Sequence, residues 1–318
     1  MARILITGSK GVVGSWLDKM LKDKGHDIFG VDLYHAVGEK GWEHEMSRGD
    51  WNYARCDIGD FRQLERIFKS AGPFDYVYNT AAEFGRWNGE DYYERVWQSN
   101  AIGTKNIIKL QEQLGFRLIH FSSSEVYGDY EDVMKEDVTD KIVIRQMNDY
   151  ALSKWVNETQ IRNSQIQHQT ETVIVRLFNT YGPGEWYHPY RSVNCKFCYH
   201  ALHNMPVVVY KGHYRTSTYL EDTCRTLSNI VDNFMPGEIY NIGGLEYHDI
   251  ETLVDTIWKV TGADRNLIEY KDSEILTTKS KKVDIQKAVD QLDHKLTVKL
   301  EDGVKASIDW MKDYYKIK

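Results

Sequence analysis

Short apolar runs alternate with helical patterns along the first half of the chain, and this alternation limits the fold more than any other feature. Apolar residues between Val12 and Lys24 recur about every 3.6 positions, whereas the runs on either side are short and strand-like. The expected strands cover 3–7, 28–33, 53–56, 76–79, 116–122 and 172–177, and the expected helices cover 12–24, 61–70, 92–114 and 149–163. This order predicts an α/β fold with a doubly wound parallel sheet and helices on both faces.

The alternation of strand and helix patterns is interrupted after residue 178. The segment from Asn179 to Arg191 is rich in turns and aromatic residues, and its glycines and prolines interrupt any regular element. Beyond it we expect helices near 193–203, 250–260 and 301–315, and strands at 207–210 and 239–242. We therefore expect a first domain over residues 1–178, to which the chain returns around 216–244, and a smaller C-terminal α/β lobe that occupies mainly 179–318.

Composition excludes several classes of protein. The 318 residues carry a net charge of -7, which would repel polyanions, so a nucleic-acid partner is not expected. No apolar run reaches the roughly 18 residues of a membrane helix, so no membrane partner is expected. The chain enters an apolar strand pattern directly after Met1, without a leader pattern, so we expect a cytoplasmic protein.

The four cysteines do not predict a metal or disulfide site. Cys195 and Cys198 would lie one helical turn apart in an apolar segment. No second pair and no nearby pair of histidines at ligand spacing accompanies them. We expect buried thiols and no metal.

A glycine-rich turn follows the first expected strand and opens the first expected helix. Gly8, Gly11 and Gly14 place backbone N–H groups and a positive helix end where a pyrophosphate could bind. Asp32 ends the second strand, 18 residues after Gly14, close to the roughly 20-residue offset of a carboxylate that binds the adenosine ribose. A carboxylate there would repel a 2'-phosphate. The pattern predicts a Rossmann-like domain that binds NAD rather than NADP.

A tyrosine and a lysine share one face of the helix expected over 149–163. Tyr150 and Lys154 are four residues apart, so the ammonium can lower the pKa of the phenol and reach a ribose hydroxyl. The run from Ser122 to Glu125 follows the preceding strand. Together these residues predict a proton-transfer site.

The ordered set of motifs resembles the extended short-chain dehydrogenase/reductase family, in particular its NAD-dependent nucleotide-sugar epimerases, dehydratases and decarboxylases. The resemblance extends from Arg3 to about Trp310. The matching segments are 7–14, Asp32, 56–58, 79–82, 100–106, 121–128, 149–154, 176–183 and 240–244. One departure is Asn79, where the family usually has histidine, and another is the unfamiliar segment 83–87.

This resemblance implies a role for each cofactor-binding position. Gly8, Gly11 and Gly14 would bind the pyrophosphate and Asp32 the ribose. The residues implied for adenine and for the lining of the cofactor channel are Asp57, Ile58, Ala81 and Ala82.

The resemblance also implies catalytic and substrate-binding roles. Tyr150 would remove the proton from the sugar 4-hydroxyl while the C4 hydride moves to NAD, Lys154 would tune Tyr150, and Ser123 would share the hydrogen bond to O4. Asn179 and Arg215 match positions that hold the nucleotide diphosphate. Three further substrate-binding candidates lie in the variable lobe: Arg191, Asn194 and Lys196.

Glu125 is the residue that most limits the choice of reaction. Epimerases of the family usually lack an acid at this position, whereas dehydratases need one to remove the C5 proton and decarboxylases handle a glucuronate-derived intermediate. Ser124 replaces the aspartic acid that many hexose 4,6-dehydratases carry, which resembles the GDP-mannose dehydratase and UDP-glucuronate decarboxylase patterns. The first expectation is a hexose 4,6-dehydratase, and the alternatives are a UDP-glucuronate decarboxylase or a nucleotide-sugar 4-epimerase.

Two further expectations concern assembly and a rival class. Trp97 and Trp155 lie on the two helices that such enzymes commonly pair, so we expect a homodimer. A non-catalytic dinucleotide-binding regulator is a remoter alternative, because a regulator has no need for a proton-transfer set. The basic cluster from Lys279 to Lys282 is expected to be a solvated surface.

Overall fold

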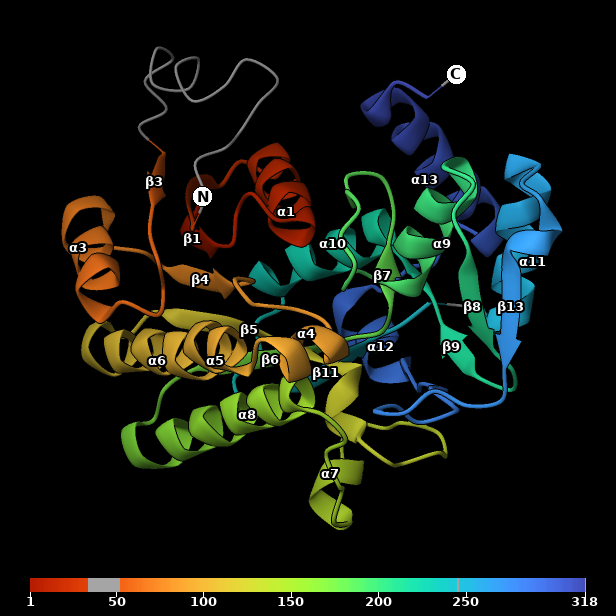
Figure 1. Cartoon of the computed structure of the whole chain (residues 1–318). Helices are drawn as coiled ribbons and strands as arrows, with labels where there is room; N and C mark the ends of the chain where they lie inside the picture. The colour runs from red at the N-terminus through yellow and green to blue at the C-terminus, as the bar shows by residue number, and fades with distance from the viewer. Residues whose placement is uncertain (34–51, 245, 318) are drawn as a thin grey trace.

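The centre of the computed structural model is a sheet of seven parallel strands, in the order β11-β6-β5-β4-β1-β2-β3. The structure describes residues 1–33, 52–244 and 246–317. The strands of this sheet are β1 (Arg3–Thr7), β2 (Asp27–Asp32), β3 (Tyr53–Arg55), β4 (Tyr76–Asn79), β5 (Arg117–Ser123), β6 (Thr172–Leu177) and β11 (Ile239–Ile242). The order reverses at β1, so the predicted doubly wound α/β fold is confirmed (Figure 1).

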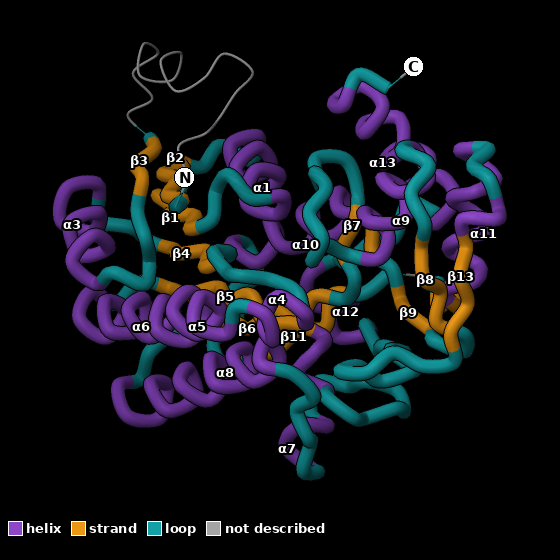
Figure 2. Tube along the Cα trace, in the orientation of Figure 1, coloured by secondary structure: helices purple, strands orange, loops and turns teal. Residues whose placement is uncertain are grey.

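Helices cover both faces of this sheet, as the purple tubes around the orange strands in Figure 2 show. One face packs against α1 (Val12–Asp23), α10 (Leu220–Ser228) and α12 (Gln286–Leu292), and the other against α3 (Phe61–Ala71), α6 (Gly103–Leu114) and α8 (Asp149–His168). Both faces bury apolar side chains, which is why the strands read as continuous apolar runs. Among the described residues, no helix is both long and apolar enough to cross a lipid bilayer.

A second core lies in the C-terminal part of the chain. It joins α9 (Val193–Leu202), α11 (Ile250–Thr261) and α13 (Leu300–Tyr315) to the parallel pair β8 (Val207–Tyr210) and β13 (Ile268–Lys271). Two small pairs lie between this core and the sheet: β7 (Thr180–Tyr181) with β10 (Thr218–Tyr219), and β9 (Tyr214–Thr216) with β12 (Tyr247–Asp249). The chain returns to the central sheet at β11, which pairs with β6. The division into two domains at residue 178 stays a prediction.

Some elements differ from the expected ones. The helix expected over 92–114 consists of α5 (Tyr93–Val96), a π-helical stretch η1 (Trp97–Ile102) and α6. The helix α8 continues beyond 163 to His168, through a polar stretch that lacks apolar periodicity, and ends at Gln169 in the left-handed conformation. Short helices too brief to show a period were not expected: α4 (Arg86–Asp91), η2 (Ser124–Tyr127), α7 (Val138–Lys141), η3 (Asn229–Val231), η4 (Arg265–Leu267) and α12.

Candidate active site

A cavity of about 1150 Å³ opens at the carboxyl edge of the central sheet and extends to the C-terminal core. Its walls come from the turns after β1, β2, β3, β4, β5 and β6, and from α9, β8 and β9. Ligands of open α/β sheets bind at this edge, where the strand order reverses. All the predicted cofactor-binding and catalytic residues line this one cavity: Gly8, Gly11, Gly14, Asp32, Asp57, Ile58, Ala81, Ala82, Ser123, Ser124, Glu125, Tyr150 and Lys154.

The glycine-rich turn has no space for side chains. Gly8 has a φ of 69°, and a Cβ atom there would lie 2.8 Å from the backbone of Ala81. A Cβ atom on Gly14 would lie 2.2 Å from the carbonyl oxygen of Gly8. The turn therefore brings the first strand, the first helix and the end of β4 close together and leaves the backbone exposed to the cavity, as a pyrophosphate-binding turn requires.

Two carboxylates lie farther along the same wall. Asp32 accepts hydrogen bonds from the backbone N–H groups of Lys10 (2.9 Å) and Leu33 (2.7 Å), which fixes the carboxylate at the end of β2. Asp57 accepts one from Gly59 (2.8 Å) and lies beside Ile58 in the cavity wall. This donor and acceptor set fits an adenosine ribose and its base.

The selectivity that this carboxylate imposes can be measured. We expect NAD to bind at least tenfold more tightly than NADP, because one unfavourable contact between Asp32 and a 2'-phosphate costs about 1.4 kcal/mol. Fluorescence titrations with the two dinucleotides would check the ratio, and equal dissociation constants would contradict the role assigned to Asp32.

Tyr150 and Lys154 both face the cavity from the first turns of α8. The Lys154 Nζ atom lies 5.9 Å from the centre of the Tyr150 ring and donates a hydrogen bond to the carbonyl oxygen of Phe121 (2.8 Å). Burial lowers the pKa of Lys154 to about 8. The pKa of Tyr150 is raised to about 12 by burial, although a hydrogen bond with Ser123 opposes the rise. The pair has the predicted arrangement, but burial raises the pKa of Tyr150, whereas we expected Lys154 to lower it.

Ser123, Ser124 and Glu125 lie where β5 ends and η2 begins. The Ser123 Oγ atom caps this turn by accepting a hydrogen bond from the backbone N–H of Glu125 (3.2 Å). The Glu125 carboxylate forms an ion pair with Lys281 and lies 3.9 Å from the Nε atom of Arg86. Burial would raise the pKa of Glu125, but the two cations outweigh it and lower the pKa. Glu125 is therefore ionised beside Tyr150.

The ion pairs of Glu125 belong to a larger buried cluster. Arg86 also pairs with Glu274 (3.1 Å), and Arg215 lies close enough to influence both Glu125 and Arg86. Burial lowers the pKa of Arg215 to about 10 and that of Lys281 to about 8, so both remain charged at neutral pH. Lys196 also acts on Glu274 and Arg86, so within the described parts of the chain the cations of the cluster outnumber its two carboxylates.

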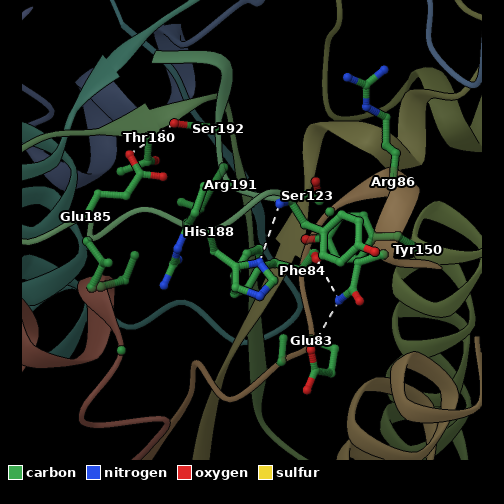
Figure 3. Close-up of a pocket in the computed structure, with 18 of the residues that line it drawn as sticks. Glu83, Phe84, Arg86, Ser123, Tyr150, Thr180, Glu185, His188, Arg191 and Ser192 are labelled. Atoms are coloured by element: carbon green, nitrogen blue, oxygen red, sulfur yellow. Dashed lines mark hydrogen bonds between the residues drawn. The ribbon is translucent and has the colours of Figure 1, made fainter. Parts of the chain in front are cut away.

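The predicted substrate-binding residues fall into two groups. Asn179, Arg191, Lys196 and Arg215 line the cavity, and the close-up in Figure 3 shows Arg191 between Glu185 and Tyr150. The Arg191 guanidinium lies over the rings of Phe84 and Trp186, 4.1 and 4.5 Å from their centres. The side chain of Asn194 does not line the cavity, because it is buried behind the wall and donates to the Ser217 hydroxyl (3.4 Å).

Sequence reasoning missed three residues of this site: Arg86, Glu274 and Lys281. The expected solvated cluster over 279–282 is wrong for Lys281, whose side chain is only 2% exposed because the extended segment turns it inward, whereas Lys279 and Lys282 are exposed. Arg86 lies in the segment that had no familiar pattern. None of these pairings is local in the sequence, so no spacing could have indicated them.

The parallel sheet, the glycine-rich turn and the Tyr150–Lys154 pair define an extended short-chain dehydrogenase/reductase. The model of the NAD dependent epimerase/dehydratase family matches residues 4–243, and the chain belongs to this family. It is therefore an NAD-dependent enzyme of the nucleotide-sugar epimerase, decarboxylase and dehydratase group, and the expectations of NAD and of enzymatic activity are confirmed. The regulator alternative is set aside.

Relatives with different activities span the whole chain. A UDP-N-acetyl-alpha-D-glucosaminuronate decarboxylase of Bacillus cytotoxicus is 27% identical over 98% of both chains. A dTDP-glucose 4,6-dehydratase of Salmonella typhimurium is 26% identical over 97% of this chain and 92% of its own. The crystal structure of a Bacillus cereus UDP-glucuronic acid 4-epimerase with UDP-glucuronic acid and NAD has the same fold, with a TM-score of 0.82 and 23% identity over 98% of this chain and all of its own.

Proposed function

We propose that this enzyme decarboxylates a nucleotide-linked hexuronic acid after oxidising the sugar at C4. The observation that carries this proposal is the buried cluster of Arg86, Arg215 and Lys281, whose positive charges outnumber the carboxylates of Glu125 and Glu274, and whose Glu125 lies close enough to Tyr150 to act on its pKa. A buried surplus charge is unfavourable unless an anion offsets it. The C6 carboxylate of a hexuronic acid would supply that anion next to the reacting carbons.

The first step uses the proton-transfer residues. Tyr150 takes the proton of the sugar 4-hydroxyl, Ser123 hydrogen-bonds O4, and Lys154 keeps a positive charge near the phenol. NAD bound along the glycine-rich turn and Asp32 supplies the acceptor for the C4 hydride, and its positive ring would lower the pKa of the neighbouring phenol. The product of this step is a ketone at C4.

The ketone makes the C6 carboxylate that of a β-keto acid. When carbon dioxide leaves, the bonding electrons move from C5 toward O4, where the hydroxyl groups of Ser123 and Tyr150 can stabilise the negative charge. Lys281 is protonated and forms an ion pair with the ionised Glu125, so this pair can deliver one proton to C5. Return of the hydride to C4, together with return of the proton from Tyr150 to O4, then yields a pentose.

The dehydratase expectation becomes the second candidate. Its support is the ionised Glu125, which could remove the C5 proton of a 4-keto hexose. Two points weaken this candidate. The O6 group that leaves is neutral and does not need a surplus of cations. Ser124 replaces the aspartic acid of many such enzymes and cannot act as an acid. A 4-epimerase needs neither Glu125 nor Lys281 for proton transfer.

We also propose that Asn179 and Lys196 hold the nucleotide diphosphate from the C-terminal side, with Arg191 nearby, so that Arg215, which the resemblance assigned to the diphosphate, keeps its charge in the cluster around Glu125. We further propose a homodimer through the helices that carry Trp97 and Trp155, because enzymes of this kind commonly pair these helices. Tyr92 and Tyr93, at the start of the first of these helices, are each more than half exposed. A monomer mass in analytical ultracentrifugation would contradict the homodimer.

One experiment separates the candidate reactions. The purified enzyme with NAD is incubated in deuterated water with UDP-glucuronic acid, UDP-glucose, dTDP-glucose and GDP-mannose, and the products are examined by mass spectrometry. We expect UDP-glucuronic acid to lose carbon dioxide and to take up one deuterium at C5. Loss of water from a hexose would favour the dehydratase, and an unlabelled C4 epimer would favour the epimerase.

A further inference from the structure

A fully buried ion pair lies directly behind the proton-transfer residues. Arg176 of β6 and Glu158 of α8 have side chains with 0% exposure and are joined by two contacts, from Nε to Oε1 (3.0 Å) and from Nη2 to Oε2 (2.7 Å). Neither residue lines the cavity. Burying two charges is costly unless their remaining hydrogen-bonding groups are satisfied, so the surroundings of this pair decide what it can do.

Every polar hydrogen of Arg176 has an acceptor. The remaining N–H groups donate to the Tyr127 hydroxyl (2.9 Å), the carbonyl oxygen of Glu136 (3.0 Å) and the Thr139 hydroxyl (3.0 Å). Glu158 has one further partner among the described residues, because the Ser122 hydroxyl donates to its Oε1 atom (2.5 Å). The pair is therefore a saturated, rigid network rather than a strained contact.

The network joins three elements that carry catalytic or substrate-binding residues. Ser122 directly precedes Ser123 at the end of β5, and Glu158 lies one helical turn after Lys154 on α8. Arg176 lies on β6, the strand that leads to Asn179. In Figure 1, β5, β6 and α8 lie side by side, in agreement with the register of the two strands and the contacts of α8 with both. One ion pair thus connects β5, α8 and β6, the elements that position Ser123, Lys154 and Asn179.

Glu158 is also the anion that acts on Lys154. Burial lowers the pKa of Lys154 to about 8, and Glu158 opposes that shift. Among the described residues, the other ionisable groups facing Lys154 are Tyr150 on the same helix and His120 of β5. The pKa of His120 lies well below its ordinary value, so that it is neutral. Arg176 of β6 contacts Glu158. Glu158 is thus placed to keep Lys154 charged at neutral pH.

We propose that the Arg176–Glu158 pair is a positioning element for the C4 oxidation, which orients Ser123 through Ser122 and holds Lys154 in its charged form. Neither residue touches the reacting atoms. The inference rests on the roles proposed for Tyr150 and Lys154 and is independent of whether a decarboxylation, dehydration or epimerisation follows. A purely structural pair could be replaced by apolar residues of similar volume without loss of function.

That replacement is the test. The variant Glu158→Leu/Arg176→Met removes both charges together, so that no unpaired charge is left in the core. Its control is Arg117→Met/Glu171→Leu, which removes an exposed ion pair (3.0 Å) at the opposite ends of β5 and β6. Urea unfolding and fluorescence titration with NAD report whether each variant folds and binds the cofactor.

We expect the buried double variant to fold and to bind NAD, while its kcat/KM for UDP-glucuronic acid falls at least tenfold. Lys154 must be protonated, so activity falls as the pH rises through its pKa. Losing Glu158 lowers that pKa further and moves the alkaline limb of the pH profile to lower pH by about one unit. The surface control should keep the profile of the unaltered enzyme.

Two further measurements keep the test decisive. If the double variant does not fold, Ser122→Ala removes only the hydrogen bond to Glu158, and kcat should fall roughly tenfold without a change in KM.

If UDP-glucuronic acid is not turned over, the ionisation of Tyr150 in the NAD complex is followed by its ultraviolet absorbance, with Tyr150→Phe as the blank. Its apparent pKa should rise in the double variant. An unaltered pH profile and an unaltered Tyr150 titration would overturn the inference even if Tyr150→Phe is inactive, whereas an active Tyr150→Phe would overturn the proposed function.

Discussion

Replacing Tyr150 by phenylalanine should lower kcat by about 100-fold to 10,000-fold, the range typical of a lost general base. The ring and its packing on α8 are kept, and only the hydroxyl that would take the proton from O4 is removed. NAD should still bind, because the glycine-rich turn and Asp32 are unchanged. Stopped-flow absorbance of NADH after substrate is added reports the loss of C4 oxidation directly.

Leu152→Ala is a matched control for this variant. Leu152 lies on the same helix, but it is 39% exposed and does not line the cavity. Its turnover should stay near that of the unaltered enzyme. If the kcat of Tyr150→Phe were similar to that of this control, another residue would have to take the proton from O4. The roles assigned to Ser123 and Lys154 would then also be wrong.

Glu125→Gln should stop the reaction after the oxidation at C4 and before the hydride returns to C4. The amide keeps the size of the side chain but loses the charge that pairs with Lys281, so it cannot pass a proton to or from C5. We expect NADH and a 4-keto sugar to accumulate while the final product falls by at least about 100-fold. Absorbance of NADH and mass spectrometry of quenched reactions measure the two quantities separately.

Glu274→Gln is the control that separates proton transfer from charge. Glu274 is the other carboxylate of the cluster and pairs with Arg86, but it has no contact with Lys281 within ion-pair distance in the described residues. Its removal should change the KM for the sugar nucleotide and leave the identity of the product unchanged. Normal product formation by Glu125→Gln would make Glu125 a structural partner of Lys281.

The sequence was most informative where a function depends on short spacings. Tyr150 and Lys154 share a helix face because they are four residues apart, and Gly8 to Gly14 form one turn, so the spacing alone is enough to predict both groups. The parallel sheet also followed from the alternation of elements, because parallel strands need crossover helices. These features depend on the backbone alone.

The charges of the site could not be placed in that way. Lys281 pairs with Glu125, which lies 156 positions earlier in the chain, whereas its neighbours Lys279 and Lys282 face solvent. The sequence alone does not distinguish the one buried lysine of this basic run from the exposed ones. Asn194 was expected to face the substrate, but the orientation of α9 turns it toward Ser217. The pKa of Tyr150 likewise depends on burial by residues from several elements.

The late position of β11 in the chain has a consequence for how the protein is made. The strand β6 is complete at Leu177, but its outer neighbour in the sheet does not exist until residue 242 has been synthesised. Until then the edge of β6 exposes unpaired backbone groups, and the apolar face that α10 covers remains open. Because domains tend to fold as units during synthesis, the first 178 residues cannot finish folding before α9 and β8 of the second core have also been synthesised.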